Sequence, residues 1–271
     1  MKALFALASS TVLCLSGASA ASARVQVQPA PRQTAAEARP RSAQVKSPQS
    51  PSLTPAELAR LREYHDRLGS TVRALPRSIS LAALLPPVLQ LAATRGVNGH
   101  LPDEVRAAFA VVAFYVNGWG LDRVVPEART WPRLERRTVL LRGRDDLSKH
   151  FALSALIAAA AGAPLAELAG LFKELDDARH GSGFSFTDLA ADRAGTKLGQ
   201  TASVSIESGR LLLARIGRSF TEDDMMPTID GLPEGLPQAE FTRLFGGVGA
   251  PAYKEMVAEI DRRVATLALF R

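Results

Sequence analysis

Residues that start or stop helices recur at short intervals from Thr54 onward, and this pattern constrains the fold more than any other sequence feature. Thr54 is followed by Pro55 and Glu57, which is a capping box with proline at the first helical position. Apolar residues follow at helical spacing up to Gly69, which predicts the end of this helix. The sequence therefore predicts an all-α fold, an irregular multi-helix bundle, for residues 54–271.

More helices are expected along the rest of this body. Pro102 and the two acids after it open an apolar helix to about Tyr115. Residues 78–94 are rich in Ala and Leu, but Pro86-Pro87 predicts two short pieces or a kink. Other helices are expected at 145–161, 164–179, 185–199, 204–217, 237–246 and 250–269, with a loop at 221–236.

One long connection interrupts this pattern at residues 121–144. It contains two prolines, and Thr138–Leu141 is its one plausible strand. We expect residues 54–271 to form a single helical domain, in which any sub-boundary would fall in this connection.

The first twenty residues have the three parts of a secretory signal peptide. Lys2 gives a positive start, residues 3–17 are apolar, and Ala20 ends a small-x-small cleavage site, with Ala23 ending a second one. The cleavage pattern disfavours the alternative of a buried first helix. The sequence therefore predicts a periplasmic or secreted protein.

The single cysteine, Cys14, lies inside this signal. Leu13 precedes it, although a lipidation site needs a small residue there. Removal of the signal would leave a chain without cysteine, which excludes disulfides, thiolate chemistry and cysteine-ligated metals.

A net charge of +6 is typical of proteins that bind nucleic acid, but the excess of basic residues is not spread over the whole chain. Residues 21–53 form a linker rich in Ala, Pro and Arg that we expect to be disordered, and together with Lys2 it contains most of the excess. Residues 52–271 contain 27 bases and 26 acids, too balanced for a surface that binds phosphates. The linker could lie on anionic lipid or an envelope polymer, or be a solvated spacer.

The apolar stretch at 151–172 is long enough to span a membrane. It is interrupted by Gly162, Pro164 and Glu167 and is poor in Leu, Ile and Val. We interpret it as a buried helical hairpin, and we expect no transmembrane span after signal removal.

Six ionisable side chains on three successive predicted helices form the candidate site. Spacings of three or four residues place each pair on one helix face. The pairs are Asp146 and His150, Glu174 and Asp177, and Asp188 and Asp192. If the three faces converge, all six could bind a divalent metal through nitrogen and oxygen ligands.

Catalysis and structural pairing are the other interpretations of this cluster. His150, Glu174, Asp188 and Asp192 are candidates for acid/base hydrolysis, in which a carboxylic acid of raised pKa acts beside a histidine base. The same residues could instead cap helices, lie on solvated faces, or form a buried network, for example with Lys149 or Arg193.

Familiar catalytic motifs are absent from the sequence. The turn His180-Gly181-Ser182-Gly183 is similar to an esterase oxyanion loop, but the chain has no G-x-S-x-G motif, which argues against a serine hydrolase. Zincin, P-loop, dinucleotide and calcium-loop motifs are absent too. We expect His65 and His100 to be solvated.

Gly195 and Gly199 lie four residues apart, on one face of a predicted helix. Two such glycines let another helix backbone approach closely, so we expect tight helix packing here, with a ligand role as the alternative.

Residues 145–199 resemble VanZ-like envelope proteins and a family of small uncharacterised periplasmic proteins. The resemblance is based on Asp146-x-x-x-His150, Glu174, the run Phe184 to Leu189, and Asp192 followed by Gly195 and Gly199. It implies an envelope role around His150, Glu174, Asp188 and Asp192. This chain departs from VanZ-like proteins in lacking several membrane spans and in having Asp192 where Asn is commoner.

Two hypotheses of function follow from the sequence. The first is a non-enzymatic envelope protein with a binding or structural role, since no strong catalytic signature is present. The second is a metal-assisted or acid/base hydrolase of envelope material that uses the histidine and carboxylate cluster.

Overall fold

The computed structural model describes residues 53–161, 183–217 and 219–271, and all of them belong to one compact unit. This part of the chain is all-α apart from two three-residue strands, which confirms the predicted fold class. The signal peptide, nearly all of the linker and the helix expected at 164–179 lie outside the described residues.

The first helix, α1 (Pro55–Ala74), begins at the predicted capping box. The Glu57 amide donates to the Thr54 hydroxyl at 3.3 Å, and the Thr54 amide donates to the Glu57 carboxylate at 2.8 Å. The prediction that Gly69 ends this helix was wrong. Gly69 lies inside α1, where a Cβ atom would meet the Leu134 side chain at 2.9 Å, so close packing explains the glycine.

The second helix, α2 (Leu81–Arg95), is continuous through Pro86 and Pro87. Of the two predicted alternatives, two short pieces or a kink, the first was therefore wrong. Three buried leucines and one buried valine flank the two prolines, and their packing offsets the hydrogen bonds that the prolines remove. These residues are Leu84, Leu85, Val88 and Leu89.

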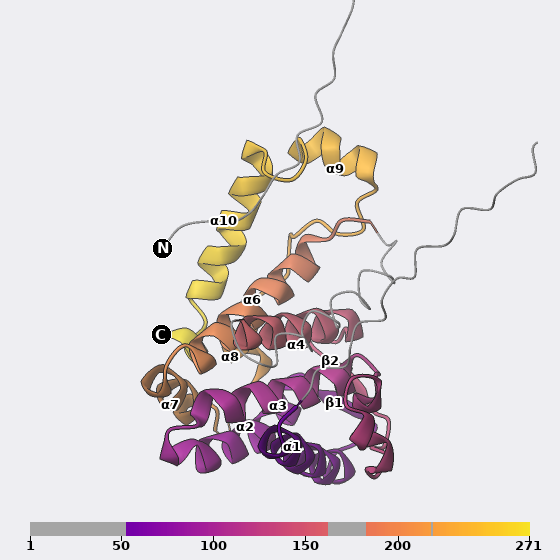
Figure 1. The fold of residues 1–271 in the computed structure, drawn as a ribbon. Helices are drawn as coiled ribbons and strands as arrows, with labels where there is room; N and C mark the ends of the chain where they lie inside the picture. Colours follow the sequence, from indigo (N-terminus) through magenta and orange to yellow (C-terminus); the bar gives the residue numbers. More distant parts are fainter. Residues whose placement is uncertain (1–52, 162–182, 218) are drawn as a thin grey trace, which may run out of the picture. The chain divides into compact units, whose positions relative to one another are not determined.

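The third helix, α3 (Leu101–Val116), is the centre of the bundle (Figure 1). Nearly all of its residues are buried, as its continuous apolar run predicts. It packs against α1, α2 and three later helices. Those three are α4 (Asp145–Ala160), α6 (Phe186–Ser203) and α7 (Ile206–Arg215).

The segment between α3 and α4 is tied into this unit. It contains two short 3₁₀ turns, Leu121–Arg123 and Pro126–Thr130, and ends in strand β2 (Thr138–Leu140). The predicted strand is thus confirmed. It pairs in parallel with β1 (Ser78–Ser80), a partner that the sequence did not indicate.

Helices α4 and α6 make the most extensive contact between elements of the described residues (Figure 1). Gly195 and Gly199 explain why they approach so closely. A Cβ atom on Gly195 would lie 2.2 Å from the Phe151 carbonyl oxygen, and one on Gly199 would lie 2.2 Å from the Ala155 carbonyl oxygen. The tight helix packing predicted from these glycines is confirmed.

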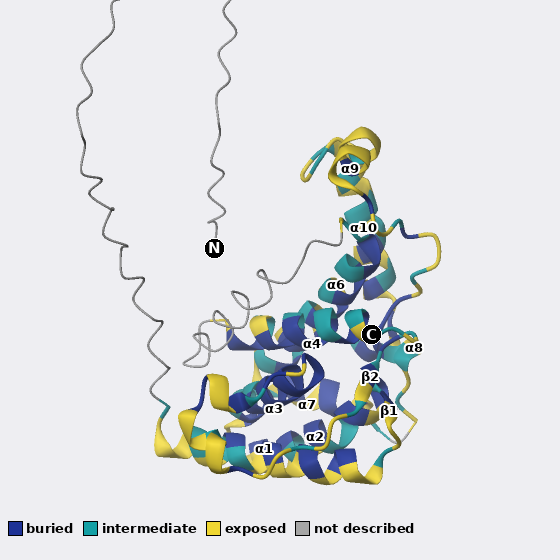
Figure 2. Ribbon diagram, turned by 90° about the vertical axis from the view of Figure 1, so that its right-hand side faces the viewer, coloured by how far each residue is buried: buried dark blue, intermediate teal, exposed yellow. Residues whose placement is uncertain are grey.

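The last part of the chain contains α9 (Gln238–Phe245) and α10 (Pro251–Ala265), and α10 packs along α6. A short helix, α8 (Glu222–Met225), interrupts the expected loop at 221–236. Much of α9 is exposed (Figure 2), and it is held by an aromatic cluster. The rings of Phe184, Phe186, Phe241, Phe245 and Tyr253 lie 4.2 to 6.3 Å apart.

The lengths and compositions of the described helices also bear on membrane association. None of them is both long and apolar enough to cross a bilayer.

Candidate functional site

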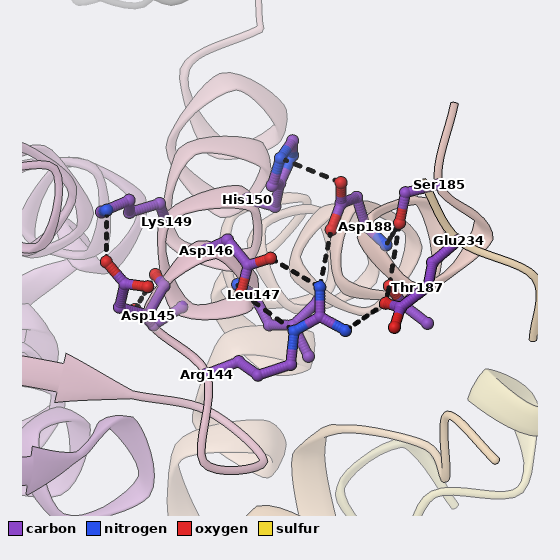
Figure 3. A network of polar contacts seen from close by, with 11 residues as sticks. Arg144, Asp145, Asp146, Leu147, Lys149, His150, Ser185, Thr187, Asp188 and Glu234 are labelled. Atoms are coloured by element: carbon purple, nitrogen blue, oxygen red, sulfur yellow. Dashed lines mark hydrogen bonds and ion pairs between the residues drawn. The ribbon is translucent and has the colours of Figure 1, made fainter. Parts of the chain in front are cut away.

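Arg144, the residue before α4, links three carboxylates of the candidate site (Figure 3). Its guanidinium donates to both oxygens of Asp146, with Nη2 at 2.6 Å and Nε at 3.1 Å. Nη1 also donates to Glu234, and Nη2 lies 3.9 Å from Asp188 Oδ1. One cation therefore joins the start of α4, the first turn of α6 and the loop before α9.

His150 lies between two carboxylates of α6. Its Nδ1 is 3.3 Å from Asp192 Oδ1, and its Nε2 is 3.7 Å from Asp188 Oδ2. The Ser154 hydroxyl, one turn along α4, donates to the same Asp192 oxygen at 2.7 Å. The side chain of His150 is 19% exposed and that of Asp188 is 21% exposed, so this cluster is only partly open to water.

The N-terminus of α6 fixes the position of Asp188. Ser185 is the N-cap, and its hydroxyl accepts from the Asp188 amide at 3.1 Å, as the predicted helix start requires. The Ser185 hydroxyl also lies 2.8 Å from the Thr187 hydroxyl, which donates to Glu234 at 3.0 Å. Glu234 was not among the sequence candidates, because it belongs to a distant loop.

The carboxylates of this cluster differ in their titration. The hydrogen bond from Arg144 lowers the pKa of Asp146, and bonds from Arg144 and Thr187 lower that of Glu234. Burial raises the pKa of Asp188, more than the nearby His150 and Arg144 lower it. Asp188 Oδ1 is buried, and it accepts no hydrogen bond within the described residues.

The geometry limits the chemistry that this cluster can perform. In a serine hydrolase triad, the histidine lies between the hydroxyl and the carboxylate. Here Asp192 accepts from Ser154 and also faces His150, so the serine proton is bonded to a carboxylate, a weaker base than imidazole. This arrangement is typical of a structural network that joins α4 to α6.

The structure therefore brings together four of the six sequence candidates. His150 contacts both Asp188 and Asp192 directly, and Asp146 is linked to Asp188 through Arg144. The other two, Glu174 and Asp177, lie outside the described residues. Among the residues that the structure describes, no group of three or more His, Cys, Asp or Glu side chains could hold a metal ion.

The suggested network paired Asp192 or Glu174 with Lys149 or Arg193. Within the described residues neither cation pairs with Asp192, and Glu174 lies outside them. Lys149 bonds to Asp145 at 2.6 Å, one turn back on α4, and Arg193 lies 3.4 Å from Asp261 of α10.

A cavity of about 500 Å³ lies at a different place, where residues 119–136 cover α1 and α3. Its aromatic walls are formed by Phe114 and Tyr115 of α3 and by Trp119 and Trp131 of the connection. Three arginines and one acid also line it, namely Arg129, Arg133, Arg136 and Asp122.

His65 lines this cavity too, and the prediction that it is solvated was wrong. The residue is only 8% exposed, and its ring packs edge-on against Trp131, with 5.2 Å between ring centroids. Burial lowers its pKa, although the Asp66 carboxylate 3.6 Å from Nδ1 opposes that shift. By contrast, the side chain of His100 is 66% exposed, as predicted.

Specific contacts hold the cavity walls in place. The Tyr115 hydroxyl donates to the Glu135 carbonyl at 2.8 Å, and Arg136 donates to the Gly118 carbonyl at 2.7 Å. The guanidinium of Arg62 lies over the Trp131 ring, 5.4 Å from its centroid. The cavity is therefore a formed feature of the fold, as ligand pockets usually are.

One feature of the sequence marks this cavity, although it matches no catalytic motif. Both tryptophans of the chain, and several arginines, fall within residues 119–136. Aromatic and arginine side chains concentrate at binding surfaces, so their density marks this connection as more than a linker between helices.

Comparison with known proteins places this chain in no family. No family model matches it, and the searches of curated proteins and of solved structures find no match. The resemblance of residues 145–199 to VanZ-like proteins therefore stays a prediction.

Proposed function

We propose that this protein is an exported, non-enzymatic protein of the cell envelope that binds a small molecule in the cavity between α1, α3 and residues 119–136. The cavity is the observation that supports this proposal most directly. Its volume of about 500 Å³ lies in the range of ligand sites, and its aromatic walls are fixed by contacts within the fold.

The state of the histidine and carboxylate cluster supports the same proposal. Arg144 is bonded to two carboxylates, and both ring nitrogens of His150 face carboxylates of α6. Side chains that are paired with one another in this way join helices, and a substrate would have to displace those contacts.

A cavity-filling substitution tests the proposed binding site. Ala128 lines the cavity and is half-buried, so Ala128→Phe should fill part of it. We expect the full chain to bind the neutral probe N-phenyl-1-naphthylamine saturably and the Ala128→Phe variant to lose most of that binding. Ala214→Phe, the same change at an exposed position of α7, is the matched control and should bind normally.

Probe fluorescence and the melting temperature of each variant complete this test. Saturable binding that Ala128→Phe leaves unchanged, in a variant that melts like the parent, would place the probe elsewhere and overturn the proposal. Absence of saturable binding to the parent chain would overturn it too.

Export is the second part of the proposal, and the signal-like residues 1–20 support it. N-terminal sequencing of the protein recovered from a secreting host should find a new N-terminus just after Ala20 or Ala23. An unprocessed chain that stays in the cytoplasm would contradict it. In the envelope, the basic linker would lie against anionic lipid or polymer.

One observation favours the alternative, an acid/base hydrolase of envelope material. A buried carboxyl of raised pKa, Asp188, lies 3.7 Å from an imidazole, which is the pairing that such a reaction needs. If this alternative holds, the purified protein should release fragments from isolated cell-wall polymer, and Asp188→Asn should abolish the release without unfolding the protein.

A further inference from the structure

The charges around the cavity indicate which ligand it accepts. Three arginines line it, whereas Asp122 is the single acid among the lining residues. Burial lowers the pKa of His65, which favours its neutral form and leaves the arginines as the dominant charges. The lining therefore has a net positive charge at neutral pH.

These arginines are also available to a ligand. Within the described ranges, no ion pair involves Arg129, Arg133 or Arg136, although arginines nearby, such as Arg137, are paired with acids. Arg129 and Arg133 are exposed, and Arg136 uses one nitrogen to donate to the Gly118 carbonyl. Unpaired guanidinium groups beside an apolar cavity bind carboxylates well, because their planar N–H groups match the two carboxylate oxygens.

The aromatic walls add a requirement of shape. Trp119 and Trp131 line the cavity at 4% and 8% exposure, whereas Phe114 is 0% exposed and presents no accessible surface to an occupant. Planar rings pack against such walls by stacking or edge contacts. An apolar ring inside and a negative charge at the arginines would satisfy both parts of the lining.

From this juxtaposition we infer that the cavity binds a small aromatic carboxylate, with its ring against Trp119 and Trp131 and its charge at Arg129, Arg133 and Arg136. This inference rests on the proposed binding function and specifies its ligand class. Exposed arginines in the cavity lining would also steer an anion toward the site.

Intrinsic fluorescence allows a direct test, because the sequence has only two tryptophans and both line this cavity. The full chain is titrated with benzoate and with benzamide, its neutral isostere, while tryptophan emission is recorded with excitation at wavelengths that neither ligand absorbs. We expect benzoate to bind at least about tenfold more tightly than benzamide, a difference typical of charge-assisted hydrogen bonds.

Substitution of the arginines identifies the source of this preference. Arg129→Gln combined with Arg133→Gln should reduce the benzoate preference to about twofold or less, because the loss of charge weakens benzoate binding much more than benzamide binding. These arginines are exposed and make no ion pair in the described part of the chain, so the variant should fold. Arg67→Gln, at an exposed position of α1 outside the cavity lining, is the matched control and should keep the preference.

The outcomes separate this inference from the function on which it rests. Equal binding of benzoate and benzamide, or a preference that the arginine variant retains, would overturn the aromatic carboxylate and leave a binding cavity. Failure of both ligands to bind would also overturn the ligand class. The proposed binding function is overturned only if the neutral naphthylamine probe shows no saturable binding, or if Ala128→Phe leaves that binding unchanged.

Discussion

Asp146 and Asp188 belong to one cluster but titrate in opposite directions, which gives a test at the scale of single residues. Arg144 lowers the pKa of Asp146, so this group stabilises the folded state above its unfolded pKa and loses that contribution as the pH falls. Burial raises the pKa of Asp188, so its contribution is present below its unfolded pKa and is lost as the pH rises through the folded value.

Two matched substitutions make this contrast measurable. At neutral pH, Asp146→Asn should lower the free energy of unfolding, whereas Asp188→Asn should leave it unchanged or raise it. Both differences should shrink near pH 3.5, where free carboxyls are largely protonated. Urea unfolding of both variants at the two pH values is the measurement. A loss of equal size for both variants at neutral pH would contradict the structural account of the cluster.

The sequence predicted which ionisable residues share a helix face, but it did not predict the residues from other segments that contact them. The spacing of Asp146 and His150, and of Asp188 and Asp192, placed each pair on one helix face, and the structure joins the two faces. Glu234 was missed because a loop residue has no periodicity that ties it to a distant helix. His65 was misjudged because its burial depends on Trp131, which lies on another segment.

A buried ionic network at Glu104 is another set of contacts between distant residues that the sequence did not predict. Helix-dipole reasoning accounts for an acid in the first turn of α3. It does not reveal that Glu104 accepts from Tyr64 at 2.8 Å, and from Arg60 and Arg95 at 2.8 and 2.9 Å. Burial alone would raise the pKa of Glu104, but these hydrogen bonds lower it. The network joins α1, α2 and α3 through residues far apart in sequence.

At the scale of elements, the contact between α4 and α6 depends on Gly195 and Gly199. In an ordinary helix interior, a change from Gly to Ala stabilises by about 1 kcal/mol, because alanine loses less backbone entropy. In α6 the new Cβ would lie 2.2 Å from the Phe151 carbonyl oxygen, which belongs to the backbone of α4. Steric overlap should therefore reverse the sign.

We expect Gly195→Ala to destabilise the protein by about 1–3 kcal/mol, the usual cost of overpacking. Gln200→Ala, at an exposed position of the same helix, is the matched control and should change stability by less than about 0.5 kcal/mol. Thermal and urea unfolding measure both. A Gly195→Ala variant that is more stable than the parent would show that the two helices are not in close contact.

Element boundaries followed local signals where capping residues were decisive. Thr54 and Ser185 begin α1 and α6 as predicted, since N-caps act through their own hydroxyl groups. Gly69, Pro86 and Pro87 failed as stop signals, because burial of neighbouring apolar residues outweighed local preference. The partner of β2 was not predictable, because a parallel pairing of three residues leaves little trace in sequence.

At the scale of the whole molecule, we propose different roles for the two candidate sites. The histidine and carboxylate cluster joins α4, α6 and the loop at Glu234, and its side chains are largely bonded to one another. The cavity near α1 and α3 combines aromatic walls with three arginines that make no ion pair with any residue the structure describes. The central claim is that a ligand binds in this cavity and that the cluster supports the fold.

Chemical shift mapping distinguishes these two places most directly. The ¹⁵N-labelled full chain gives two indole N–H signals, from Trp119 and Trp131, and separate backbone amide signals from α4 and α6. On addition of benzoate, we predict saturable shifts of both indole signals and of amides in residues 119–136, with little change at His150 or Asp188. Unchanged indole signals, or shifts concentrated at His150, Asp188 and Asp192, would contradict this account.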